Sequence, residues 1–164
     1  MRTILFILLS FLFINSSYSQ DNDLHKMSRK QRKEYLCEKA KEVTINFAPT
    51  YYREHGKPKI EGTFRFKSRY PEDSLLIDRK YYIVTLPYDP KKDIKDYKIR
   101  FVSKVYIWED NGEPLKIKFS HGMSWLFYGT GTGHTYNERV KKGIKEKDQM
   151  KLIDPDDYGP NVID

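Results

Sequence analysis

The sequence predicts an α+β fold, in which an N-terminal amphipathic helix packs on a curled antiparallel sheet of four to five strands, followed by a short C-terminal helix. Apolar residues between Ser28 and Pro49 recur at steps of three and four, as they do on one face of a helix. From Ile60 onward apolar and polar residues alternate instead, which is the period of a half-buried strand. No internal repeat interrupts this order of helix and then sheet.

The helix is predicted to begin at Ser28 and to end before Pro49. Ser28 and Gln31 have the spacing of a capping box, in which each side chain satisfies a free backbone N–H of the other residue. Pro49 disfavours helical dihedral angles at the preceding residue and so stops the helix. The residues expected to face the sheet are Leu36, Ala40, Val43 and Phe47.

The sheet is predicted from segments that alternate between apolar and polar residues or are rich in β-branched and aromatic residues. The connection 109–114 contains Asn111-Gly112, a pair suited to positive φ, and therefore predicts a hairpin. The loops on either side of the second segment contain Pro71 and Pro90. The predicted strands are 60–67, 81–86, 99–108 and 115–120, with 125–128 as the candidate for a fifth.

Two further segments follow the sheet. Tyr136, Val140 and Ile144 are spaced by four residues in a charged setting, which predicts a short C-terminal helix. Residues 154–164 contain prolines and a glycine and are interpreted as a C-terminal tail. The α+β domain is accordingly expected to span residues 28–153.

The first 19 residues have the organisation of a signal peptide. Arg2 precedes the apolar run Thr3 to Ile14, which is too short to cross a bilayer, and small serines precede the expected cleavage after Ser19. An uncleaved interfacial helix is the alternative. We expect an exported protein, periplasmic or extracellular, in which residues 20–27 form a flexible leader.

Composition narrows the possible classes of protein. Thirty Lys and Arg against 23 Asp and Glu give a net charge of +7, which favours acidic partners. The single cysteine, Cys37, excludes a disulfide framework within the chain. We expect it to be a buried, inert thiol, with an intermolecular disulfide or a redox role as the alternative. No second long apolar run is present, so no transmembrane segment is expected after signal removal.

An N-terminal amphipathic helix followed by a curled antiparallel sheet resembles the cystatin-like and NTF2-like α+β families. The stretch from Tyr81 to Phe119, with its long connection and its hairpin at Asn111-Gly112, is similar to the sheet of small NTF2-like proteins. The Gln-x-Val-x-Gly loop of cystatin inhibitors is absent, so the resemblance does not imply inhibition. It implies a binding or partner protein more often than an enzyme.

If the apolar strand faces pack on the helix, several cations and two large aromatic rings share the opposite face of the sheet. Such residues bind phosphate, sulfate or carboxylate and offer flat stacking surfaces. The sequence thus predicts a non-catalytic binding protein for an anionic ligand or an acidic protein surface. An ordinary solvated sheet face is the alternative. The predicted ligand-binding residues are Arg65, Lys67, Arg100, Lys104, Tyr106, Trp108, Lys116 and Lys118.

The sequence also contains features that bear on functions other than anion binding. Nucleic acid is not an expected partner, because export argues against it and no reader motif is present. A small hydrolase or metal-dependent enzyme could use His121, His134 and Glu138, the last two sharing one face if helical. The glycine-rich segment 129–133 matches neither phosphate-binding motif and is interpreted as a flexible loop, so no cofactor is predicted. A structural or protein-interaction module that uses the sheet or the tail is the third possibility.

Overall fold

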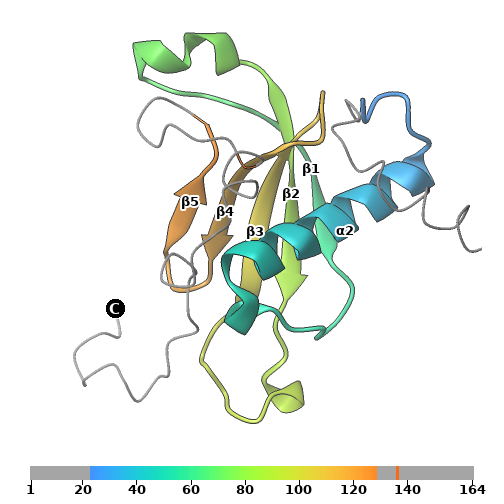
Figure 1. The fold of residues 1–164 in the computed structure, drawn as a ribbon, viewed down its shortest axis with the longest axis vertical. Coiled ribbons are helices and arrows are strands. Elements are labelled where there is room, and N and C mark those ends of the chain that lie inside the picture. The colour runs from blue at the N-terminus through green and yellow to red at the C-terminus, as the bar shows by residue number, and fades with distance from the viewer. Residues whose placement is uncertain (1–22, 129–135, 137–164) are drawn as a thin grey trace, which may run out of the picture.

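A computed structural model places one long helix diagonally across one face of an antiparallel sheet (Figure 1). The structure describes residues 23–128 and Tyr136. The predicted α+β class is confirmed within this part of the chain, where five strands follow the order β1-β2-β3-β4-β5. The predicted signal peptide, the glycine-rich loop, the tail and, apart from Tyr136, the C-terminal helix lie outside the described residues.

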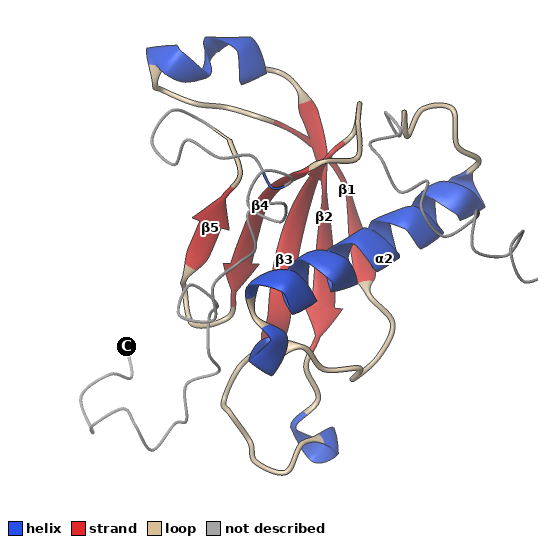
Figure 2. Ribbon diagram, in the orientation of Figure 1, coloured by secondary structure: helices blue, strands red, loops and turns tan. Residues whose placement is uncertain are grey.

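The elements alternate with short helical turns, as Figure 2 shows. The helix α2 spans Arg29–Phe47, and the 3-10 helices are η1 (Pro49–Tyr51), η2 (Pro71–Leu76) and η3 (Pro90–Lys92). The strands are β1 (Lys59–Arg65), β2 (Lys80–Pro87), β3 (Phe101–Trp108), β4 (Pro114–Phe119) and β5 (Ser124–Leu126). Each strand pairs only with its neighbour in sequence within this sheet, so the connections are simple antiparallel turns and loops.

The helix forms for the reasons that its sequence indicates. The Ser28 hydroxyl accepts a hydrogen bond from the Gln31 backbone N–H at 3.3 Å, and the Gln31 side chain accepts one from the Ser28 N–H at 3.1 Å. This is the predicted capping box. All the residues predicted to face the sheet are buried, namely Leu36, Ala40, Val43 and Phe47. Thr44 is buried on the same helix as well.

Two residues in the N-terminal part of the chain have a different environment from the one expected. Leu24, which belongs to the predicted leader, is fully buried in the main core, and its carbonyl accepts a hydrogen bond from Arg32. Cys37 is half-buried rather than buried. Burial still raises the pKa of the Cys37 thiol, which keeps it in the less nucleophilic protonated form.

The main core lies between α2 and the sheet. Val84, Val105 and Ile117 from the three central strands are fully buried against the helix. A polar contact crosses this interface: the Thr44 hydroxyl donates to the Ala40 carbonyl and lies 2.7 Å from the Ser103 hydroxyl. Since both groups are buried, the pair satisfies two hydroxyls that would otherwise be desolvated at a cost of about 1–3 kcal/mol each.

The other side of the sheet, here called the back face, carries a second apolar cluster. Phe66, Trp108 and Leu115 are its buried members. The Trp108 and Phe66 rings meet edge to face, with 5.5 Å between their centroids. The Arg79 guanidinium carbon covers the Trp108 ring, 4.1 Å from its centroid. The partly buried residues packed around the cluster are Leu76, Tyr81, Tyr106 and Tyr128.

Register shifts in β1, β3 and β4 explain how apolar residues reach both faces. In β1 the shift between Glu61 and Phe64 lets Ile60 pack on the main core while Phe64 stacks on Tyr81 of the back face. In β3 and β4 the pairings skip Val102 and Leu115, each an extra residue opposite its partner strand. An extra residue of this kind resets the alternation of side chains.

The predicted hairpin between β3 and β4 is present and turns at Gly112, whose φ is +70°. The Gly112 carbonyl accepts a hydrogen bond from the Tyr35 hydroxyl of α2 at 3.3 Å. A Cβ atom on Gly112 would lie 2.8 Å from that same hydroxyl oxygen. Only glycine therefore satisfies both the backbone conformation and the close approach of the helix.

We expect Gly112→Ala to lower the free energy of unfolding by about 1–3 kcal/mol, because it adds a strained φ and a clash with Tyr35. Urea unfolding of the two proteins measures the difference. Gly62→Ala is the matched control, since a Cβ atom there meets nothing within 4 Å, and it should change stability by less than about 0.5 kcal/mol. Equal effects of the two substitutions would contradict this account of the turn.

Candidate anion-binding surface

The strand register aligns one row of polar side chains across the back face. Lys59 lies opposite Thr85, Thr85 opposite Lys104, Lys104 opposite Lys118, and Lys118 opposite Ser124. We call these five residues the lysine row. Because adjacent strands lie about 4.8 Å apart, the backbone positions of the row extend over roughly 19 Å.

A second row lies beside the first. Glu61 aligns with Ile83, Ile83 with Tyr106, and Tyr106 with Lys116. The Lys116 ammonium lies 5.6 Å from the centroid of the Tyr106 ring, within the range of a cation–π contact. The two rows together place four lysines, one glutamate and one tyrosine on neighbouring positions of the sheet.

The positive charge of this surface is only partly compensated. Lys104 forms an ion pair with Glu61 at 3.7 Å, and both side chains are about 30% exposed, at 29% and 31%. Within the described residues, neither Lys116 nor Lys118 has a carboxylate within 4 Å. Burial lowers the pKa of Lys116, and the nearby charge of Lys118 lowers that pKa further. An anion bound here would relieve this repulsion.

A hydroxyl group within the row lacks a partner. The Thr85 side-chain oxygen is buried and makes no hydrogen bond among the described residues, although its neighbours in the row are Lys59 and Lys104. The row therefore contains an unsatisfied hydroxyl that is closed off from solvent between two lysine positions.

The structure brings together four of the eight predicted binding residues, namely Lys104, Tyr106, Lys116 and Lys118. The expectation that Trp108 is an exposed ring is wrong: only 4% of it is accessible, since the extra residue in β4 puts Leu115 beside it and Arg79 covers the ring. Tyr106 is half-buried. Lys59, which belongs to the row, was not predicted because it precedes the first alternating residue of β1.

The other three predicted residues do not join the lysine row. The shift in β1 reverses the alternation, so Arg65 lies opposite Lys80, off the back face, and pairs with Asp78 at 3.8 Å. Lys67 is exposed in the loop that follows β1. Arg100 is exposed one residue before β3, where its backbone N–H donates to the Ser120 hydroxyl. Their predicted place with the other cations is therefore wrong.

Of the three residues of the alternative enzyme site, His121 lies within the described part of the chain and contacts a buried tyrosine. His121 Nε2 lies 2.6 Å from the hydroxyl of the buried Tyr51, and burial lowers the pKa of His121. His134 and Glu138 lie outside the described residues. Among residues 23–128 and Tyr136, no three His, Cys, Asp or Glu side chains are placed to hold a metal ion.

A folded-state pKa below the ordinary value means that the unfolded chain binds the proton of His121 more readily. This contribution to stability is complete above about pH 6.5 and is lost as the pH falls below it. We expect the free energy of unfolding to fall more between pH 7.5 and 5.5 in the wild type than in His121→Gln. Urea titrations at the two pH values measure both changes, and parallel losses would refute the assignment.

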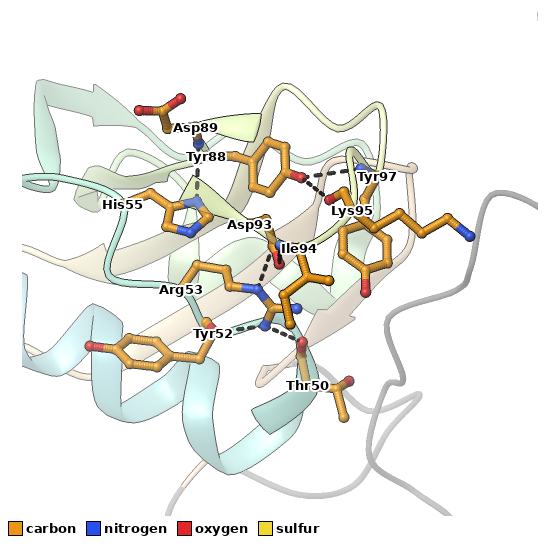
Figure 3. Close-up of polar contacts among 10 residues, drawn as sticks. All are labelled: Thr50, Tyr52, Arg53, His55, Tyr88, Asp89, Asp93, Ile94, Lys95 and Tyr97. Carbon is orange, nitrogen blue, oxygen red and sulfur yellow. Dashed lines mark hydrogen bonds and ion pairs between the residues drawn. The ribbon is translucent and has the colours of Figure 1, made fainter. Parts of the chain in front are cut away.

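A different polar network orders the loops at the end of the sheet near η3 (Figure 3). Arg53 pairs with Asp93 at 2.7 Å and donates to the carbonyls of Thr50 and Tyr52. The Tyr88 hydroxyl donates to the Lys95 carbonyl. Arg53 also lines a surface cavity of about 290 Å³, but its charge is matched by Asp93. This network explains loop order and offers less uncompensated charge than the lysine row.

The fold and the surface together define a class: an α+β protein whose antiparallel sheet is covered by a helix on one face and carries a lysine row on the other. Protein-family models, curated proteins and solved structures include none that matches this chain. No helix in the described part of the chain is both long and apolar enough to cross a membrane.

The like charges of Lys116 and Lys118 should affect the pKa of Lys116 measurably. The pKa of Lys116 should lie below the ordinary value of a lysine side chain, and it should rise when Lys118 is replaced by glutamine or when an anion binds. NMR titration of the lysine side-chain carbons beside the ammonium groups measures these values. A Lys116 pKa that is unchanged in Lys118→Gln would show that the two charges do not interact.

Proposed function

We propose that this chain is a small exported, non-catalytic binding protein that holds an anionic ligand, or the acidic surface of a protein partner, against the back face of its sheet. The observation that carries the proposal is the alignment of Lys59, Lys104 and Lys118 in one cross-strand row. As part of the same proposal, we keep the resemblance of the chain to the cystatin-like or NTF2-like families, which rests on the order of its elements alone.

The physical argument rests on the pairing of like charges. Lys104 and Lys118 lie directly opposite each other on adjacent strands, where like charges are destabilising, and the Glu61 carboxylate beside Lys104 offsets only part of this charge. A carboxylate, sulfate or phosphate between them would accept hydrogen bonds from both ammonium groups and convert the repulsion into attraction.

The central test replaces Lys104, Lys116 and Lys118 together by glutamine, which removes charge and keeps the approximate length of each side chain. We expect affinity for heparin, used as a model polyanion, to weaken by about 3-fold to 150-fold, because each of the three lost ionic contacts contributes about 0.2–1 kcal/mol. Elution salt on a heparin column and titration calorimetry measure the change. Binding should also weaken steeply with added salt.

The matched control replaces Lys30, Lys33 and Lys91 by glutamine. These lysines are exposed and lie on α2 and η3, so the net charge falls equally without touching the back face. The control should keep most of the heparin affinity, and far-UV circular dichroism should show that both variants are folded. Equal losses in the two triple variants would mean that diffuse charge, and no particular surface, binds the polyanion.

A further inference from the structure

The loop between β1 and β2, residues 66–79, exposes large apolar side chains. Leu75 is 91% accessible, and Tyr70 and Ile77 are exposed as well, as is Phe64 near the end of β1. The loop contains η2 and extends beyond the end of the sheet (Figure 1, top). Exposed apolar groups gathered on one segment mark a surface that contacts a partner.

The loop is held in place from within. The Phe66 N–H donates to the Arg79 carbonyl at 2.8 Å, and the Asp78 N–H donates to the Phe66 carbonyl at 3.0 Å, which closes the base of the loop. The Ser68 hydroxyl donates to the carboxylate of the buried Asp73 at 2.6 Å. Leu76 packs on the second cluster while its neighbour Leu75 faces solvent. The exposure of Leu75 is thus a feature of an ordered loop.

Charge on and beside this loop is unevenly exposed. Residues 65–80 contain five Lys and Arg against three Asp and Glu. Asp73 is buried against Ser68, and Asp78 pairs with Arg65. The exposed cations that remain are Lys67, Arg69 and Lys80, against the one exposed carboxylate of Glu72. The Arg69 guanidinium lies 5.5 Å from the centroid of the Tyr70 ring. Cations and an amphipathic ring therefore accompany the apolar side chains.

We propose that the 66–79 loop docks the protein on the surface of an anionic phospholipid bilayer. Leu75 and Ile77 would enter the boundary between head groups and acyl chains, Tyr70 would remain at head-group level, and Lys67, Arg69 and Lys80 would contact lipid phosphates. A bilayer offers apolar matter beneath a negative surface, which is the complement of this projecting loop. Such docking requires no membrane-spanning helix.

This proposal uses residues outside the lysine row, so the two can fail separately. The probe is sedimentation of residues 20–164 with vesicles of equal phosphatidylcholine and phosphatidylglycerol, and with vesicles of phosphatidylcholine alone. Residues 1–19 are omitted because their apolar run would itself bind lipid. We expect at least tenfold tighter binding to the anionic vesicles.

The decisive variant is Leu75→Ser with Ile77→Ser, and we expect it to bind anionic vesicles at least tenfold more weakly. Ile94→Ser is the control, since Ile94 is fully exposed, as Leu75 nearly is, but lies in the loop after η3. That loop is at the opposite end of the sheet from the 66–79 loop (Figure 1). Ile94→Ser should bind like the wild type. Heparin affinity of the double variant should be unchanged, which separates this surface from the lysine row.

Three outcomes would overturn the proposal. The first is a wild-type protein that does not sediment with anionic vesicles, which would leave the loop as a contact for a protein partner. The second is a Leu75→Ser, Ile77→Ser variant that binds as tightly as the wild type. The third is equal loss in Ile94→Ser. If only the triple glutamine variant at Lys104, Lys116 and Lys118 lost binding, the lysine row and not the loop would hold the membrane.

Discussion

The packing of α2 on one face of the sheet is the constraint on which the rest of the molecule depends. It buries the apolar stripe of the helix against the central strands and fixes the hydroxyl pair of Thr44 and Ser103 between them. Once that face is covered, every side chain that alternates to the other side must either find a second apolar cluster or remain polar. The back face contains both, with Trp108 in the cluster and Lys104 in the lysine row.

Much of this arrangement can be predicted from the sequence, because the features that predict it are local. The Ser28 and Gln31 capping box, the apolar stripe from Leu36 to Phe47 and the turn at Gly112 each depend on residues within a few positions of one another. The strands of the hairpin also follow from alternation, and their ends in the structure differ from the predicted ones by one or two residues. Such boundaries depend on pairing with other strands.

The binding surface was harder to predict because alternation assumes an uninterrupted strand. A single extra residue, such as Val102 or Leu115, moves all later side chains to the other face, and nothing in the local sequence marks it. The same effect separates Arg65 from Lys104, although the two have equivalent positions in the sequence pattern. The burial of Trp108 also depends on Arg79, which is distant in the sequence and becomes its neighbour only through the fold.

The strand β3 supplies both sides of the sheet, with Val105 and Ile107 in the main core and Trp108 in the second cluster. The backbone of β3 therefore belongs to both clusters. Loss of its strand pairing would disrupt both of them, so the two clusters should unfold together. The domain should behave as one cooperative unit. A ligand that binds only the folded arrangement of Lys104 and Lys118 would stabilise the folded state by mass action. It would therefore also stabilise the packing of α2 on the opposite face.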